Sequence, residues 1–376
     1  MHALFRFSLL ATVLGCGGYH HDQNDQVDAS TASDTNPPVQ GTTRKLDVLF
    51  VVDDSSGMLS KQQKLAAGIW ELFERLEAFN GDGLPDLHVG VISSDVGTRG
   101  TDGISAGSIG TPGMGGCIGS GKAGILQTTG APVLGTFITD TREPDGSRRT
   151  NYTGELADVV GQMVMLGEGG CGFEQPLQAM RLALDGNVEN AGFLRSDAAL
   201  AVVFITDEDD CSIAHASLLG SDPALGPLQS FRCTRFGVTC DDGGETPDEM
   251  NELGAKSGCR SNANSPFLVD VGTYVGFLKS LKSDPSLIVV AGLFGDTSPV
   301  HVEARVPTGS SSSIPALAHS CSVMGSQGVE VADPGIRLKT LFDGFPGHQA
   351  VHSICRGDFG DALYEIANLI TVVAPD

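Results

Sequence analysis

The stretch that decides the fold is Asp47–Met58, with the sequence DVLFVVDDSSGM. Its apolar part, Leu49 to Val52, shows no polar alternation, which predicts a strand buried on both faces, as in the centre of a parallel sheet. The strand ends abruptly in two carboxylates, two hydroxyls and a glycine. Open α/β sheets bind their ligands at the carboxyl ends of the strands. We therefore expect a functional site at Asp53 and Ser55.

A second stretch has the same pattern, because the apolar run Ala201–Ile205 leads directly into TDEDD at 206–210. If the two strands are parallel neighbours, they lie about 5 Å apart, and Asp53 and Asp207 meet at one edge. Crowded carboxylates repel one another, which raises their pKa values unless a cation or hydrogen bonds intervene. The pattern predicts a divalent cation, Mg²⁺ or Ca²⁺, which these ligands do not distinguish. The alternative is that Asp53 caps the turn through backbone N–H groups and binds no metal.

Strand-like apolar runs alternate with helical periodicity along the rest of the chain, which predicts an α/β fold. We expect a doubly wound, mostly parallel central sheet flanked by helices, formed by one domain over residues 44–376. Three stretches have little periodicity and are expected to be long insertions pinned by disulfides: about 96–150, 211–266 and 296–333.

The N-terminal residues predict export. Residues 1–15 combine Arg6 with a short apolar core, which is typical of a signal peptide and too short to span a membrane. The end of this segment, Val13-Leu-Gly-Cys16, resembles the lipobox of bacterial lipoproteins. This resemblance implies that Cys16 is lipidated, and Gly17 after it implies that the lipid lies in the outer membrane. Whether the protein faces the periplasm or the outside is left open. Residues 16–43 are polar and predict a flexible tether, so the lipid is the only expected membrane contact.

The cysteine count favours disulfides. Nine cysteines minus Cys16 leave eight, an even number in an exported chain, whereas no Cys-x-x-Cys pair supports zinc. Eight cysteines allow 105 pairings, so connectivity stays open. The first candidates are Cys117 with Cys171 and Cys321 with Cys355; the others are Cys211, Cys233, Cys240 and Cys259.

The charge composition excludes one class of partner. The net charge is −23 and no basic cluster occurs, whereas a nucleic-acid-binding protein needs Lys and Arg to neutralise phosphates. An acidic surface instead suits an exported protein or loosely held divalent cations.

The first strand and its turn resemble the von Willebrand factor A (vWA) domain, whose metal-ion-dependent adhesion site begins Asp-x-Ser-x-Ser. Asp53 and Ser55 match this motif, but Gly57 stands at its third position. The threonine of the family's second loop is replaced by Cys171, and the aspartate of its third loop matches Asp207. Segments 170–177, 205–212 and 353–356 are similar to those of a group of bacterial vWA-domain lipoproteins.

The resemblance implies a cation held by Asp53, Ser55 and Asp207, with Ser56, Glu174 and Glu208 as additional candidate ligands. An acidic residue of a protein partner completes the coordination of such a cation in this family. We therefore expect a non-enzymatic envelope protein that binds an unknown protein ligand through the metal. The alternatives are a structural envelope protein with a non-functional site, and a metal-dependent hydrolase. The hydrolase is the less favoured because no histidine adjoins either acidic strand end in the sequence.

Overall fold

The buried run Leu49 to Val52 lies in β1 (Lys45–Val52), the middle strand of a seven-stranded sheet. The sheet order is β14-β9-β5-β1-β2-β3-β4. The strands from β14 to β2 are parallel, and β3 and β4 are antiparallel. The prediction of an α/β fold with a mostly parallel central sheet is confirmed. The other strands of this sheet are β2 (Asp86–Ser93), β3 (Ile138–Arg142), β4 (Arg148–Thr150), β5 (Ala199–Ile205), β9 (Ile288–Phe294) and β14 (Gln349–Ser353).

The computed structural model describes residues 44–79, 83–111, 114–307, 311–325 and 328–373. The expected export signal at 1–15, the lipidated Cys16 and the tether at 16–43 lie outside the described residues. The described residues all belong to one unit, Thr42–Asp376. None of the helices within these ranges is long and apolar enough to cross a membrane.

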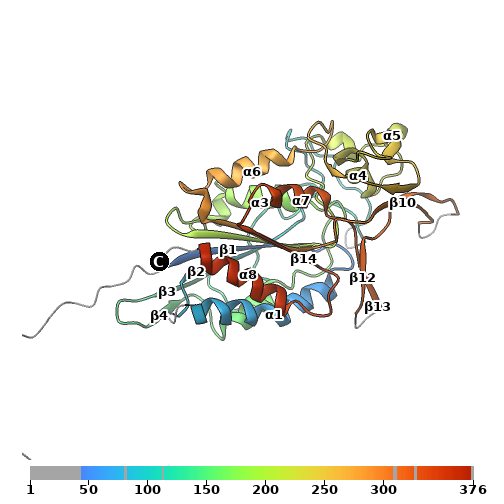
Figure 1. Cartoon of the computed structure of the whole chain (residues 1–376). Helices are drawn as coiled ribbons and strands as arrows, with labels where there is room; N and C mark the ends of the chain where they lie inside the picture. The colour runs from blue at the N-terminus through green and yellow to red at the C-terminus, as the bar shows by residue number, and fades with distance from the viewer. Residues whose placement is uncertain (1–43, 80–82, 112–113, 308–310, 326–327, 374–376) are drawn as a thin grey trace, which may run out of the picture. The chain divides into compact units, whose positions relative to one another are not determined.

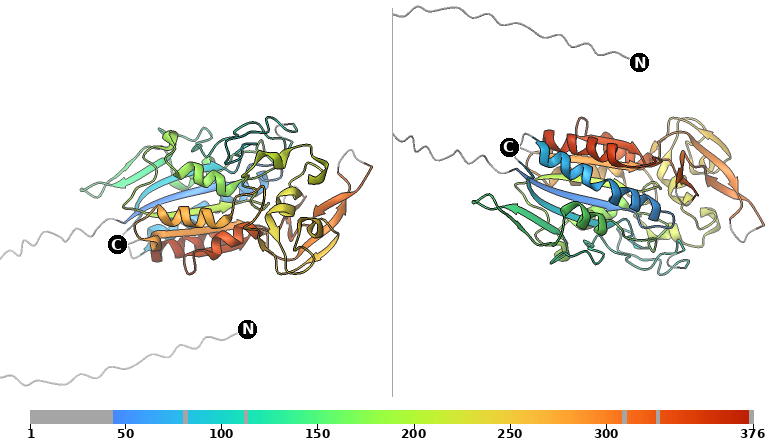
Figure 2. Two further views of the ribbon diagram at one scale, coloured as in Figure 1. Left: turned by 90° about the horizontal axis from the view of Figure 1, so that it is seen from above. Right: turned by 90° about the horizontal axis from the view of Figure 1, so that it is seen from below.

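Helices cover both faces of the sheet (Figure 1). On one face, α1, α2 and α8 pack against the strands, and on the other α3, α6 and α7 do so, as the two views of Figure 2 also show. Their bounds are α1 (Leu59–Ala78), α2 (Leu156–Met163), α3 (Pro176–Leu184), α6 (Val271–Ser280), α7 (Ile336–Asp343) and α8 (Gly360–Val373).

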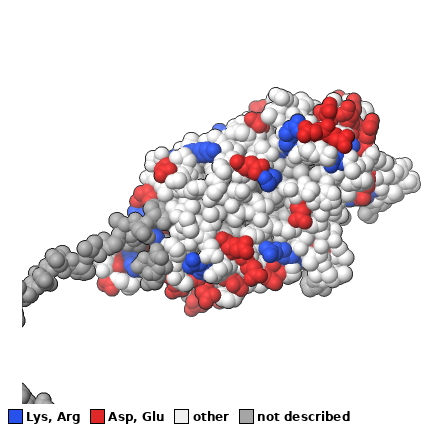
Figure 3. Space-filling view, viewed as in Figure 1, with Lys and Arg blue, Asp and Glu red and all other residues white. Residues whose placement is uncertain are grey.

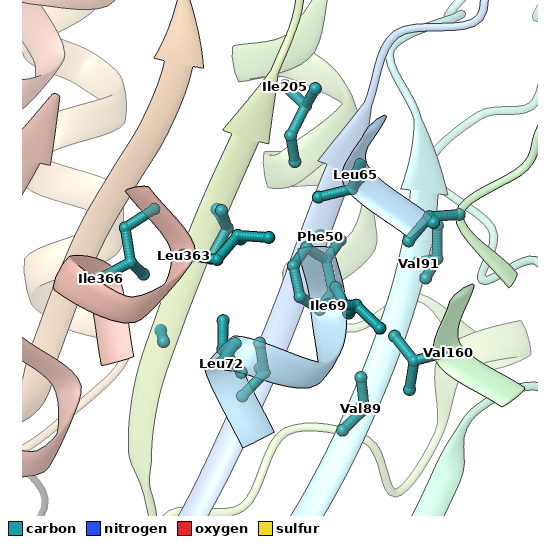
Figure 4. Close-up of a cluster of buried hydrophobic side chains, with 14 of the residues drawn as sticks. Phe50, Leu65, Ile69, Leu72, Val89, Val91, Val160, Ile205, Leu363 and Ile366 are labelled. Atoms are coloured by element: carbon teal, nitrogen blue, oxygen red, sulfur yellow. The ribbon is translucent and has the colours of Figure 1, made fainter. Parts of the chain in front are cut away.

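Each face of the sheet carries its own hydrophobic core. Because side chains alternate along a strand, Phe50 points to the core formed with α1, and Leu49 points to the opposite core. Figure 4 shows Leu65 and Ile69 of α1 packed over Phe50. Burying a side chain of this size contributes about 1.5–3 kcal/mol. These two cores fix β1 between β2 and β5, and so fix where its carboxyl end lies.

The three stretches expected to be irregular contain regular structure, which corrects that expectation. Residues 96–150 supply β3 and β4, which extend the main sheet with antiparallel strands. The other two insertions gather beyond the carboxyl ends of the parallel strands (Figure 1). They contain α4 (Phe231–Gly237), α5 (Pro247–Met250), β6 (Val238–Thr239), β7 (Gly254–Lys256), β8 (Arg260–Ser261), β10 (Val300–Arg305), β11 (Ile314–Leu317), β12 (Cys321–Gly325) and β13 (Gly328–Ala332). Short 3₁₀ turns in the described residues include Val188–Asn190, Ala216–Leu219, Pro223–Leu225 and Pro285–Leu287.

Four disulfides hold these insertions. The pairs are Cys117–Cys171, Cys211–Cys233, Cys240–Cys259 and Cys321–Cys355. The first and last are the two pairs put forward from the sequence. Cys117–Cys171 joins the first insertion to the loop before α3, and Cys321–Cys355 joins β12 to the segment after β14.

Most of the surface in Figure 3 is uncharged, and its acidic side chains gather most densely over the part of the second insertion that carries α5. Exposed carboxylates there include Asp241, Asp242, Glu245 and Asp248. This distribution agrees with the net charge of −23.

Candidate functional site

The two acidic strand ends lie side by side. β1 and β5 are parallel neighbours with Val52 opposite Ile205, so the residues that follow them leave the sheet together. The backbone N–H of Asp53 donates to the carbonyl oxygen of Ile205 at 2.9 Å, and Thr206 Oγ1 donates to Asp53 Oδ2 at 2.8 Å. The structure therefore brings Asp53 and the Thr206-Asp207 pair to one edge of the sheet.

Asp53 is completely buried among hydroxyl groups. Its Oδ1 accepts hydrogen bonds from the backbone N–H of Ser55 at 2.8 Å and from Ser94 Oγ at 3.5 Å. Burial, together with the negative charge of Asp207, raises the pKa of Asp53 to about 7. Ser94 and Thr206 were missed as site residues, although each directly follows a strand beside β1 as Asp53 follows β1.

Asp207 forms an ion pair with a lysine side chain. Lys61, in the first turn of α1, donates from Nζ to Asp207 Oδ2 at 2.6 Å and to the carbonyl oxygen of Gly57 at 3.2 Å. Burial raises the pKa of Asp207, and the ammonium of Lys61 opposes this shift. The sequence analysis did not include Lys61 in the site. Its position four residues after Gly57, at the start of a predicted helix, is the pattern that would have found it.

Glu174, which is buried, and Glu208, which is partly buried, form a carboxyl pair. Burial raises the pKa of Glu174 well above its ordinary value, and the charges of Glu208 and Asp53 raise it further. The pKa of Glu208 is also well raised, by burial and then by the charges of Asp333 and Asp207, while a hydrogen bond with Glu174 opposes the shift. No described residue donates a hydrogen bond to the buried Oε1 of Glu174. A buried carboxyl oxygen without a donor is a costly arrangement, which a bound cation would relieve.

Asp54, Asp209 and Asp210 also follow the two strands, where crowding of all the carboxylates was expected, but they do not share this site. Asp54 accepts from Ser93 Oγ at 2.5 Å and pairs with Lys122. Asp209 instead caps α7, accepting from the backbone N–H of Arg337 at 2.9 Å. Hydrogen bonds and ion pairs thus satisfy these carboxylates separately.

Asp210 forms a buried ion pair with Arg337. Its Oδ2 lies 3.0 Å from Nη2 of Arg337, and both side chains are at most 1% exposed. Asp210 Oδ1 also accepts from the backbone N–H of Leu177 at 3.2 Å and from Ser212 Oγ at 2.6 Å. The pair therefore connects the start of α3 with α7.

Cys171 stands where the vWA resemblance places a threonine ligand. It is bonded to Cys117, so its sulfur is neither a thiolate nor a hydroxyl. Mg²⁺ and Ca²⁺ prefer oxygen ligands, and the disulfide removes this position from the ligand set. Ser56 is exposed at the turn above Asp53.

A cavity of about 360 Å³ opens above the site. Ser55, Ser56, Glu174 and Glu208 form its floor, and α4 and β11 contribute to its walls. A second cavity, of about 400 Å³, lies over Lys61 and Asp207. The residues lining both cavities are Ser56, Glu208, Ser230, Arg305 and Asp333.

A histidine also reaches this edge, which corrects the reason given against a hydrolase. His319 Nδ1 lies 2.7 Å from Asp333 Oδ1, and the backbone N–H of Asp333 donates to the carbonyl oxygen of Asp207 at 2.8 Å. His319 comes from the third insertion, more than a hundred residues after Asp207, so adjacency in the sequence gave no sign of it.

The donors at Asp53 fit a hard cation. Within the described ranges, no three His, Cys, Asp or Glu side chains are arranged as a metal-binding group. The available set is instead mixed: the Asp53 carboxylate, nearby hydroxyls including Ser55, and the Glu174 oxygen that lacks a donor. Carboxylate and hydroxyl oxygens are the ligands that Mg²⁺ and Ca²⁺ accept.

Comparisons with known proteins give no family assignment. No family model matches the sequence, and no curated protein matches it. Among solved structures, the chain is similar to the conserved hypothetical protein BatB from Bacteroides thetaiotaomicron, with 11% identity, a TM-score of 0.31, and coverage of 87% of this chain and 98% of BatB. It is also similar to the pilus adhesin SpaC from Lactobacillus rhamnosus GG, with 10% identity, a TM-score of 0.33, and coverage of 89% of this chain and 30% of SpaC.

Proposed function

We propose that this protein is a non-enzymatic binding protein whose doubly wound, vWA-type domain holds Mg²⁺ or Ca²⁺ at the carboxyl edge of its sheet. The cation is held by Asp53 and Ser55, with Glu174 and Glu208 beside them, and an acidic group of a protein partner completes its coordination. The expected lipid on Cys16 tethers this domain to the cell envelope, at the outer membrane.

The observation that carries the proposal is a group of carboxyls without a counter-ion at this edge. No described Lys, Arg or His side chain forms an ion pair with Asp53, Glu174 or Glu208. Asp53 and Glu174 are buried and Glu208 is partly buried. Carboxyls so placed without a counter-ion depart from the usual arrangement, in which buried charges are paired or bind metals. A divalent cation would neutralise two of the three charges and supply a partner for Glu174 Oε1.

The test is a thermal melt with Mg²⁺, with Ca²⁺ and with EDTA. A cation that binds only the folded protein stabilises it by about 2.7 kcal/mol at 100 times its Kd, so the melting temperature should rise. The Asp53→Asn variant should lose this rise, whereas Asp241→Asn, at an exposed carboxylate, should keep it. If the wild-type protein melts at the same temperature in all three solutions, the structural envelope protein is the better interpretation.

Replacing Lys61 tests whether its ammonium competes with the divalent cation for the Asp207 carboxylate. The Lys61→Met variant frees the Asp207 carboxylate, which then adds a ligand of the vWA set to the site. We expect cation binding to tighten by about tenfold, equivalent to about 1.4 kcal/mol. Isothermal titration of the variant and the wild-type protein with Ca²⁺ measures this change. Weaker binding in Lys61→Met would show that the ammonium supports the cation site and does not compete with it.

A further inference from the structure

The cavity above the proposed cation site has a polar floor and apolar walls. Its apolar lining comes from Phe173 beside the floor, from Leu228 and Phe231 of the second insertion, and from Ile314 and Leu317 of the third. Glu208 comes from the loop after β5 and Glu174 from the loop before α3, whereas most of the apolar surface comes from the insertions. The walls therefore add a feature that the sheet edge alone does not have.

The charged groups of the walls are already matched. Asp333 pairs with His319 at 2.7 Å, and Arg305 Nη2 donates to a carboxylate oxygen of Glu303 at 2.9 Å and to the carbonyl oxygen of Leu317 at 2.8 Å. Among the other carboxyls that line the cavity, Glu174 and Glu208 have no partner of opposite charge among the described residues, and Asp209 accepts from the backbone N–H groups of Arg337 and Leu338. A ligand in this cavity therefore meets one polar point at the floor and apolar surface around it.

The size of the cavity limits what can enter. A volume of about 360 Å³ lies at the low end of the 300–1,000 Å³ range of small-molecule sites. A stable interface between two folded proteins instead buries about 1,200–2,000 Å². Since the insertions stand around the floor, a ligand reaches the cation by inserting a group into the cavity rather than by lying across the edge.

We infer that the cavity binds a carboxylate joined directly to a compact apolar group, with the carboxylate on the cation and the apolar group against Phe231 and Leu228. This inference rests on the proposed function and narrows its partner. A free aryl or alkyl carboxylic acid and the C-terminal residue of a peptide share this chemistry. No bond is made or broken when either binds.

The experiment is isothermal titration of the folded domain with defined probes, in Ca²⁺ or Mg²⁺ and in EDTA. Phenylacetate should bind at least tenfold more tightly than acetate when the cation is present, because its ring adds buried apolar area, and binding should disappear in EDTA. The peptide Gly-Gly-Phe with a free C-terminus, compared with its amidated form, distinguishes a chain end from a free acid. Binding of the free-carboxyl peptide would identify a chain end as a suitable source.

Two variants test the wall. Phe231→Ala and Leu228→Ala should each weaken phenylacetate about fivefold or more and leave acetate unchanged. Leu228 is 44% exposed, so its removal leaves folding intact. Leu253→Ala is the matched control, since Leu253 lies in the same insertion, is 58% exposed and does not line the cavity.

The failures are distinguishable. If cations raise the melting temperature but phenylacetate binds no better than acetate, the inference is overturned and the proposed function stands. If no cation raises the melting temperature, both are overturned. Binding of phenethylamine in EDTA would also overturn the inference, because it would show that the acidic floor takes an amine directly.

Discussion

Replacing Arg337 with methionine is expected to lower the free energy of unfolding by about 3–5 kcal/mol, because it leaves the buried Asp210 carboxylate without its cation. Arg337 donates from Nη2 to Asp210 Oδ2 at 3.0 Å and to the carbonyl oxygen of Val269 at 2.8 Å. Its Nε donates to the carbonyl oxygen of Asp210 at 2.9 Å. Methionine replaces the aliphatic part of the arginine side chain but supplies none of these donors.

The matched control is Lys339→Met, on the same helix. Lys339 pairs with Asp343 four residues away, where both side chains are substantially exposed. Such surface pairs contribute about 0.3–0.5 kcal/mol, so this variant should stay close to the wild-type protein in a urea titration. The double variant Asp210→Asn with Arg337→Met should lose less than the two single losses added together, since no buried charge is left unpaired. Equal losses for Arg337→Met and Lys339→Met would contradict the importance of the buried pair.

The second large effect is a loss of stability with rising pH in EDTA. Burial raises the pKa of Asp53 to about 7 and that of Asp209 to about 6, and the pKa values of Glu174 and Glu208 are also raised. Between about pH 4 and pH 7 the folded protein therefore keeps protons that the unfolded chain has released. Stability from these groups is complete below their unfolded pKa values and is lost as the pH rises through the folded ones. Each such proton contributes about 1.4 kcal/mol per pH unit.

Thermal melts from pH 5 to pH 8 measure this slope. In EDTA the melting temperature should fall across the range, and Asp53→Asn should reduce the fall because an amide does not ionise. Asp241→Asn, at an exposed position, should leave the slope unchanged. Adding Ca²⁺ should reduce the fall in the wild-type protein, since a cation stabilises the ionised carboxylates. A melting temperature that rises steadily from pH 5 to pH 8 in EDTA would show that these carboxyls are not buried as described.

The sequence predicts the centre of the fold well, because the central strands are determined by apolar runs within the strands themselves. Leu49 to Val52 and Ala201 to Ile205 are uninterrupted apolar runs, which are typical of strands covered on both faces. The antiparallel strand β3 was missed because Ile138–Arg142 is short and mixes polar with apolar residues within a long polar stretch. Its identity as a strand comes from pairing with β2, which is a property of the assembled sheet.

The site divides in the same way. Asp53 and Asp207 meet because each directly follows a strand, which the sequence displays. Asp209 and Asp210 lie outside the site because α7, more than a hundred residues away in the sequence, supplies their partners. These partners are backbone N–H groups for Asp209 and the Arg337 guanidinium for Asp210. His319 reaches the edge through the third insertion in the same manner. The sequence around a carboxylate does not show which distant element will supply its hydrogen-bond or ion-pair partner.

Lys61 gives this edge a counter-ion that is part of the chain and cannot dissociate from the protein. Its ammonium ties the turn after β1, at Gly57, to the end of β5, at Asp207, with or without a dissolved metal. Under the proposed function, a cell in ion-poor surroundings would keep a folded receptor in its envelope that no longer binds its ligand, and ligand binding would return as soon as divalent ions return.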